Sequence, residues 1–145
     1  MMSPGELAAS LAEHRRRLVE LFRNPRLDLL AERLGRDPPP RMSGLYALGD
    51  RLLREAAEYP VPGGPVCVQN FLPLTDAAVI NCGRYGDRFL RFAVGQDGEP
   101  LLVSLTGSPF LAVDFDTRYD SGGTPDVEEL PVRFDDLLAA VRRDP

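Results

Sequence analysis

The sequence predicts an α+β fold with N-terminal helices, an antiparallel β meander and a C-terminal helix packed on the sheet. Three observations lead to this prediction. Residues 1–60 carry capping signals and apolar residues at helical spacing, and residues 66–115 carry short alternating apolar runs separated by Gly-containing turns. Residues 131–143 carry a further helical pattern. A chain of 145 residues has the length of a single domain.

Two helices are expected within the first 35 residues. The first begins at a capping box formed by Ser3 and Glu6, in which each side chain satisfies the amide of the other residue. A second start signal at Asn24-Pro25 leads to a helix that Gly35 ends. The first helix is expected to bury one apolar stripe, made of Leu7, Leu11, Leu18, Leu21 and Phe22.

A stiff connector, a third helix and a break are expected next. Residues 37–40, Asp-Pro-Pro-Pro, cannot be helical internally, because proline lacks an amide donor and restricts the residue before it. The third helix is expected from Arg41 to Tyr59, with Met42 and Leu45 among its inward residues. The Pro- and Gly-rich residues 60–65 are expected to end it.

Short strands are expected after this break, namely Val66–Leu72, Ala77–Cys82, Arg88–Val94, Pro100–Leu105 and Phe110–Phe115. Turns at residues 96–98 and 107–109 join the last three strands into a meander with one buried apolar face, which includes Phe115. Asp120 to Thr124 is expected to be a loop. Pro131 to Arg143 is expected to be a helix with acids at its N-terminus and arginines at its C-terminus.

Charge is distributed unevenly along the chain. There are 17 basic residues, all of them Arg, and 22 acidic residues, which gives a net charge of −5. The excess is concentrated in residues 114–136, which contain eight acids and only two arginines. This balance is not typical of a protein that binds nucleic acid through phosphate contacts. No membrane-spanning stretch and no signal peptide are found, and with Cys67 and Cys82 expected to be reduced we expect a cytoplasmic protein.

The acidic segment contains no recognisable catalytic or metal-binding motif. Asp114-x-Asp116-x-x-x-Asp120 is similar to the start of a calcium-binding loop, but Tyr119 and Pro125 occupy the positions that require Gly and Glu. His14 is the only histidine and lies beside three arginines, so neither a catalytic triad nor a zinc site is expected. We therefore expect no enzymatic activity, no metal and no cofactor.

Several short motifs occur in the order found in a known family. An acid, a Leu-Gly pair and a Pro-rich stop in residues 32–40 precede Leu45-Tyr46, and then follow Phe71–Leu74, Phe92–Val94, Asp97-Gly98, Leu101–Leu105 and Phe134–Leu138. This order resembles the SUKH superfamily, which contains bacterial toxin-immunity proteins and fungal cell-wall-assembly regulators. The resemblance extends from Leu29 to Val141. It implies one SUKH-like domain over residues 1–145, with residues 1–28 as a helical extension and residues 29–145 as the core.

The chain departs from the family pattern at two points. The usual Asn-Gly-Gly after the Leu-Tyr helix is replaced by residues 48–51, Leu-Gly-Asp-Arg, and the chain contains no Trp. The resemblance nevertheless implies a non-enzymatic domain that binds a protein partner, often a nuclease or deaminase toxin. Such a toxin carries a basic cleft, to which an acidic surface would be steered.

The residues expected to contact this partner are Asp114, Asp116, Tyr119, Asp120, Asp126, Glu128 and Glu129. Two other functions remain open: a regulatory or scaffold module that binds a host protein, and an enzyme of an unrecognised type. Arginine also forms bidentate pairs with carboxylates, so the acids are either offered to a partner or paired within the chain. Neither the identity of the toxin nor the oligomeric state follows from the sequence.

Overall fold

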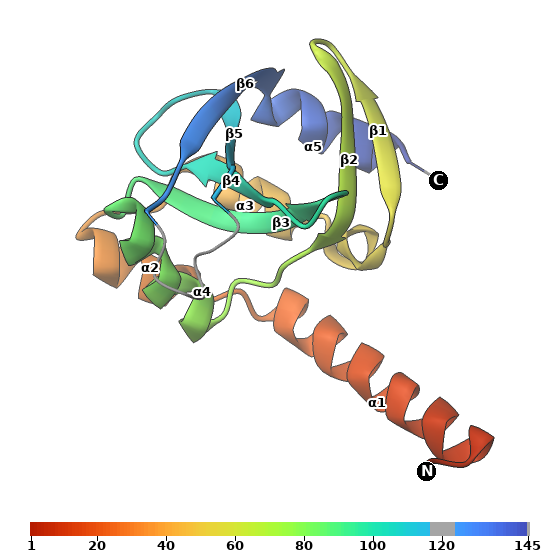
Figure 1. Cartoon of the computed structure of the whole chain (residues 1–145). Helices are drawn as coiled ribbons and strands as arrows, with labels where there is room; N and C mark the ends of the chain where they lie inside the picture. Colours follow the sequence, from red (N-terminus) through yellow and green to blue (C-terminus); the bar gives the residue numbers. More distant parts are fainter. Residues whose placement is uncertain (117–123, 145) are drawn as a thin grey trace.

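The computed structural model of the chain describes residues 1–116 and 124–144 (Figure 1). Within these residues, six antiparallel strands form one curled sheet in the order β1-β2-β3-β4-β5-β6. The helices α1 (Pro4–Arg23), α2 (Leu27–Leu34) and α3 (Pro40–Tyr46) precede the sheet. Helix α5 (Phe134–Arg143) follows the last strand and packs on the sheet. The predicted α+β fold class is therefore confirmed.

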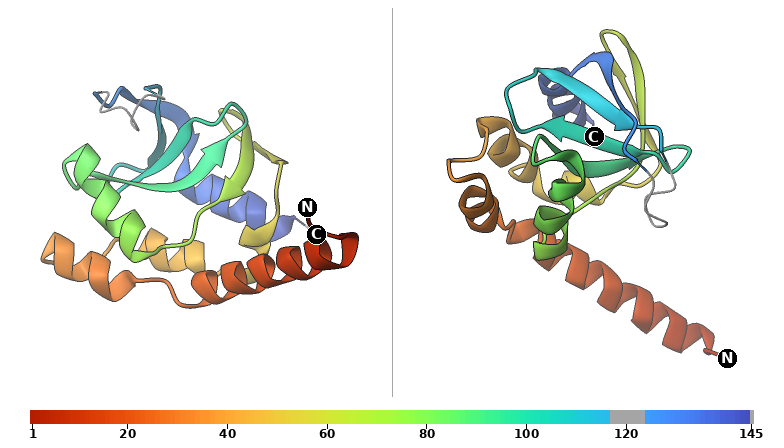
Figure 2. Two further views of the ribbon diagram at one scale, coloured as in Figure 1. Left: turned by 60° about the horizontal axis from the view of Figure 1, so that its bottom comes forward. Right: turned by 60° about the vertical axis from the view of Figure 1, so that its left-hand side comes forward.

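Helix α1 begins at the predicted capping box and α2 ends at the predicted Gly35, but Asn24 caps the C-terminus of α1, and α2 begins at Leu27 without a side-chain cap. The Ser3 hydroxyl accepts a hydrogen bond from the Glu6 amide at 3.1 Å, and the Glu6 carboxylate accepts one from the Ser3 amide at 3.3 Å. Gly35 ends α2 in the left-handed conformation, with φ of 69°. Helix α1 extends away from the body of the molecule in Figure 1 and in the right-hand view of Figure 2. Of its apolar stripe only Phe22 is buried, so the predicted burial of the whole stripe is wrong.

The long third helix predicted from Arg41 to Tyr59 is also wrong. The chain forms the short helix α3, a 3-10 turn η1 (Gly49–Leu53) and then strand β1 (Ala57–Val61). Gly49 and Ala56 have positive φ angles of 58° and 52°, which an α-helix cannot accommodate. Strand β1 lies at an edge of the sheet, where Pro60 is tolerated because no neighbour on one side needs its amide.

The Pro- and Gly-rich residues 60–65 form a hairpin. Val61 pairs with Gly64, so Pro62 and Gly63 are the two-residue connection between β1 and β2 (Gly64–Phe71). Gly63 has a φ of 96°, which suits the second central residue of a type II turn preceded by proline. The sheet curls so far that this turn lies against β6 (Val127–Arg133). The contact is close enough that a Cβ atom on Gly63 would overlap the carbonyl oxygen of Pro131.

Four of the five predicted strands are confirmed as β2, β3 (Phe89–Gly95), β4 (Pro100–Ser104) and β5 (Phe110–Asp114). The strand predicted at Ala77–Cys82 is wrong. It is the helix α4 (Asp76–Asn81) followed by the 3-10 turn η2 (Cys82–Tyr85). The Thr75 hydroxyl accepts a hydrogen bond from the Ala78 amide at 3.2 Å, and this N-cap starts the helix.

Strand β6 is absent from the prediction. It includes Pro131, where the last helix was expected to begin; that helix instead starts at Phe134. Most of the predicted loop, residues 120–123, lies outside the described residues. Phe115 was expected on the buried face, but it follows the end of β5 and is 52% exposed.

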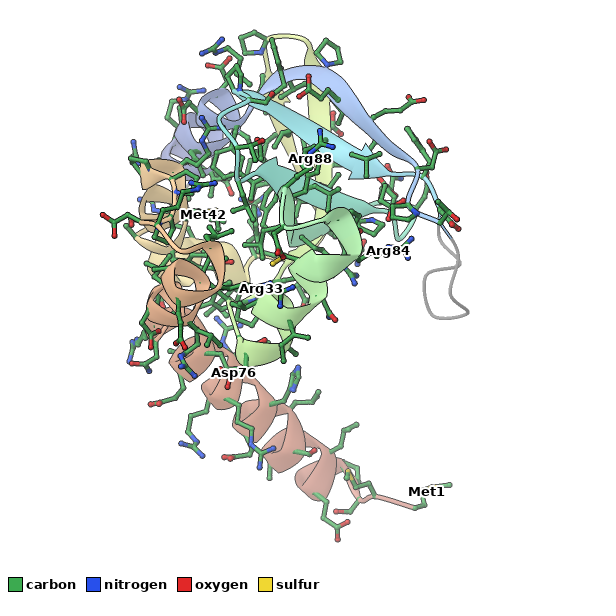
Figure 3. All side chains as sticks on the ribbon, turned by 90° about the vertical axis from the view of Figure 1, so that its left-hand side faces the viewer. Met1, Arg33, Met42, Asp76, Arg84 and Arg88 are labelled. Carbon is green, nitrogen blue, oxygen red and sulfur yellow. The ribbon has the colours of Figure 1, made fainter. Side chains whose placement is uncertain are left out.

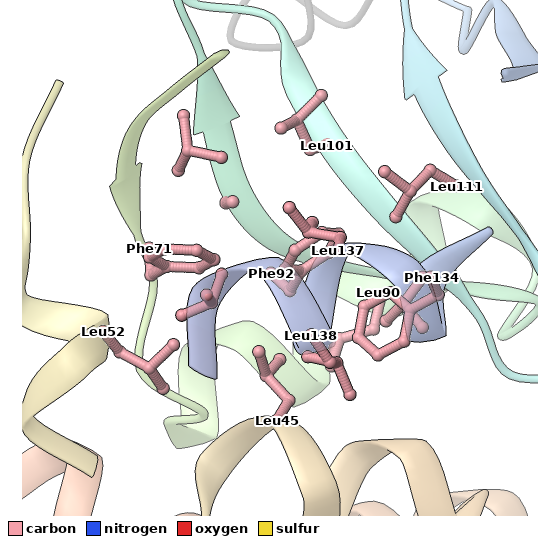
Figure 4. Close-up of a cluster of buried hydrophobic side chains, with 14 of the residues drawn as sticks. Leu45, Leu52, Phe71, Leu90, Phe92, Leu101, Leu111, Phe134, Leu137 and Leu138 are labelled. Atoms are coloured by element: carbon pink, nitrogen blue, oxygen red, sulfur yellow. The ribbon is translucent and has the colours of Figure 1, made fainter. Parts of the chain in front are cut away.

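The hydrophobic core lies between the sheet and the helices α3 and α5 (Figure 4). The rings of Phe92 on β3 and Phe134 on α5 meet edge to face, with their centroids 5.2 Å apart. The predicted meander face supplies Leu90, Phe92, Leu101, Val103, Leu105, Leu111 and Val113, all of which are buried. In the described part of the chain, no helix is both long enough and apolar enough to span a membrane.

We predict that Gly63→Ala is more destabilising than a glycine substitution that changes backbone conformation alone. Gly98 is the matched control, because its φ of 83° is also positive but no atom lies near its missing Cβ. Gly98→Ala should lower the free energy of unfolding by about 1 kcal/mol. Gly63→Ala should lower it by about 3 kcal/mol, because the turn must also move away from β6. Urea unfolding of both variants tests this, and equal losses would show that the hairpin does not press on β6.

Candidate functional site

The predicted contact residues lie where β5 ends and β6 begins, and the structure separates them into two groups. Asp114 ends β5 and Asp116 follows it, and the two residues are only 0% and 8% exposed. Tyr119 and Asp120 lie outside the described residues. The exposed group comprises Asp126, Glu128 and Glu129. Burial therefore divides a cluster that is continuous in the sequence.

The Asp114 carboxylate is the centre of the buried group. Its Oδ1 atom accepts hydrogen bonds from the backbone amides of Asp116 and Asp126, at 3.0 and 3.1 Å. Its Oδ2 atom accepts from the Tyr85 hydroxyl at 2.8 Å and from the Arg84 Nε at 3.2 Å. Four donors thus converge on one side chain, which holds the end of β5, the start of β6 and the turn η2 together.

The strand pattern explains why an acid occupies this position. Leu111 and Val113 belong to the apolar core, and alternation places Asp114 on the opposite face of β5. The hydrogen bond from the Asp116 amide to the Asp114 side chain closes an Asx turn, a local turn that Asp side chains commonly form. Just beyond, the Phe115 amide donates to the Asp126 carbonyl at 2.8 Å, so the backbone also closes at this point.

The hydrogen bonds set the ionisation of this cluster. Burial raises the pKa of Asp114, but the donors from Asp126, Tyr85, Asp116 and Arg84 together outweigh it and hold this pKa below its ordinary value. Burial, and then the neighbouring Asp114 carboxylate, raise the pKa of the Tyr85 phenol to about 12. At neutral pH an ionised Asp114 therefore accepts from a protonated Tyr85.

A groove of about 460 Å³ lies beside this cluster, between η2, the start of β3 and β6. Figure 3 labels the two cations that line it, Arg84 and Arg88. Arg84 is held by Asp114 and also lies 4.0 Å from the Asp116 carboxylate. The opposite wall is formed by Pro125, Val127 and Glu129. The groove therefore has a basic wall, formed by Arg84 of η2 and by Arg88 just before β3, and an acidic residue on β6.

The exposed acids lie on or beside an edge strand. Among the described strands β6 forms strand pairing only with β5, and the β1–β2 turn contacts it at Pro131. The Ser108 hydroxyl donates to the Glu129 carboxylate at 2.6 Å. No ion pair between described residues involves Asp126, Glu128 or Glu129. Internal pairing with arginine thus accounts for Asp114 and Asp116 but not for these three acids.

Arg84 and Tyr85 were not identified from the sequence. They follow the stretch mistaken for a strand, and 30 and 29 residues separate them from Asp114. The one available signal was that Asp114 continues a buried strand, since a buried carboxylate needs donors to offset its desolvation. That argument indicates that partners exist but not which residues they are.

Comparison with known proteins adds no assignment. Neither a protein-family model, nor a curated protein, nor a solved structure matches the chain. Within the described residues, no group of three or more His, Cys, Asp or Glu side chains is arranged to hold a metal ion. The site is therefore interpreted from its own geometry.

We predict that Asp114→Asn lowers the free energy of unfolding at pH 7 by about 3 kcal/mol, because Arg84 loses its buried anionic partner. The wild-type contribution is present above the pKa of an unfolded Asp, about 4, and is lost as the pH falls towards the lower folded pKa. The difference between the two proteins should therefore shrink at pH 3.

Urea unfolding at pH 7 and pH 3 measures both effects. Asp126→Asn is the matched control, because Asp126 contributes its backbone amide to the cluster while the residue is exposed. Its effect should stay within about 0.5 kcal/mol. Equal losses for Asp114→Asn and Asp126→Asn would contradict the role given to the buried carboxylate.

Proposed function

We propose that the chain is a non-enzymatic, SUKH-like protein-binding domain that neutralises a nuclease or deaminase toxin through β6. One observation carries the proposal: Asp126, Glu128 and Glu129 are exposed on or beside an edge strand, and no arginine of the described residues pairs with them. Carboxylates on such an edge that no described arginine pairs with can bind a cationic partner.

Electrostatics favours a partner with a basic cleft. An enzyme that acts on nucleic acid binds phosphates through cations, and an acidic surface that covers this cleft excludes the substrate. Complementary charge mainly raises the association rate and suppresses other partners. The part of β6 before Pro131 can in addition pair with an extended segment of the partner, while its charges oppose indiscriminate strand pairing.

The predicted contact set is revised by this proposal. Asp114 and Asp116 are buried and hold the backbone beneath the surface in place, whereas Asp126, Glu128 and Glu129 contact the partner. Phe115 adds an apolar anchor, because its side chain is half exposed and its amide is bonded to the Asp126 carbonyl. An aromatic side chain surrounded by charge is a common centre of binding energy in protein interfaces.

The ionisation of nearby groups supports a binding function over catalysis. General acid–base catalysis near neutral pH needs a group whose pKa lies near the working pH. Burial, with the bonded Asp114 carboxylate, raises the pKa of Tyr85 to about 12. Burial, and the hydrogen bond to Asp87, raise the pKa of the Cys82 thiol to about 11, which makes it a poor nucleophile.

We predict that the double charge reversal Asp126→Arg with Glu128→Arg slows association with the proposed cognate toxin at least tenfold at low salt. The reason is that the two carboxylates steering a basic cleft become cations. Stopped-flow or surface-plasmon-resonance association rates at low and high salt measure the effect, which should diminish as salt screens it.

The matched control is Glu32→Arg with Asp37→Arg, which changes the net charge equally at two exposed positions on and after α2. It should leave the association rate within about twofold. A β6 variant that associates as fast as this control would contradict the proposed surface. Failure of the chain to bind the toxin and rescue its host, with a host protein captured instead, would favour the regulatory module.

A further inference from the structure

Helix α1 exposes a regular apolar seam that the proposed function does not use. Its residues recur at alternating spacings of four and three, which are the a and d positions of a heptad repeat. Such a repeat is typical of a helix that packs along another helix. Leu7 and Leu11 are 50% and 60% exposed in the half of α1 that extends from the body (Figures 1 and 2). The seam comprises Leu7, Leu11, His14, Leu18 and Leu21.

The other end of the seam borders a groove on the body. This groove measures about 360 Å³ and lies between the C-terminal half of α1, the turn η1 and the end of β2. Leu18 lines it from α1, and Leu52 and Leu53 line it from η1. The rest of its lining is mixed, with Phe22, Phe71 and Leu72 beside the polar residues His14, Glu55, Gln69 and Asn70. One half of α1 therefore carries exposed leucines, and the other half borders a groove that contains leucines.

The two halves of α1 also carry opposite charge. Residues 4–13 contain two acids, Glu6 and Glu13, and no arginine, whereas residues 14–23 contain four arginines and one acid. Two such helices side by side attract each other when antiparallel and repel when parallel. Glu13 already bonds Arg16 at 2.6 Å within its own helix, so the net charge of each half sets the orientation.

We infer that α1 of a second copy of this chain occupies the seam and the groove, in antiparallel orientation. Pairing a with d positions places Leu7 of one copy opposite Leu18 of the other, and the twofold axis passes between Ala12 and Glu13. Each copy then inserts its exposed leucines into the groove of its partner, which gives a closed, symmetric contact. The contact supplies tertiary packing to a half-helix that is only marginally stable in isolation.

The mass of the full chain in solution tests this inference. Sedimentation velocity at tens of micromolar should give a dimer, twice the 16.0 kDa of one chain. Leu7→Arg with Leu11→Arg should raise the dissociation constant of the dimer at least hundredfold and give a monomer, because two arginines replace the apolar side chains of the contact. The folded body should be unchanged because both side chains are exposed. Ala9→Arg, on the opposite face of the helix, is the matched control and should remain a dimer.

Disulfide trapping tests the orientation, in a Cys67→Ser background that removes the partly exposed native thiol. A mixture of Leu7→Cys and Leu18→Cys chains should form a crosslinked dimer, whereas Leu7→Cys alone should not. A wild-type monomer at all concentrations, or a dimer that persists in the Leu7 and Leu11 double variant, overturns the inference. Crosslinking of Leu7→Cys to itself overturns the antiparallel arrangement.

Discussion

One buried carboxylate, that of Asp114, organises the face of the molecule to which we assign a function. Removing a charge from water is costly unless donors replace the lost hydration, and here two backbone amides, a phenol and a guanidinium do so. Because these donors come from η2, from the residues after β5 and from the start of β6, one side chain fixes the relative positions of all three. The groove and the acidic edge strand are both built on this junction.

The acidic segment 114–136 therefore serves several purposes. Asp114 and Asp116 are internal and associate with Arg84. Asp135 and Asp136 lie in the first turn of α5, where the helix dipole favours negative charge. The acids on and beside β6 have no structural arginine among the described residues, and for that reason we assign them to a partner. Acid content alone could not have separated these groups, whereas burial and hydrogen bonding do.

Local signals predicted the parts of the fold that local interactions determine. The Ser3–Glu6 capping box, the Gly35 helix end and the alternating residues of β3 to β5 each lie within a few positions of one another. The errors occur where pairing between distant segments, or a single helix cap, decides the structure.

The run Ala77–Cys82 is apolar enough for a strand, yet the Thr75 cap makes it a helix. Strand β6 carries Glu and Pro, which disfavour strands, and forms because β5 offers an edge to pair with. The partners of Asp114 are distant in sequence, so no spacing pattern reveals them.

The central claim is that Asp114 is an ionised structural anchor and not part of the contact surface. An NMR pH titration that follows the Asp114 side-chain carboxyl carbon together with the Asp116 and Asp126 amide protons tests it most directly. The account predicts that Asp114 titrates below the ordinary range of Asp and that both amide protons shift in the same step, because both donate to the same oxygen. An Asp114 that titrates at the ordinary value, with neither amide proton responding, would contradict the account.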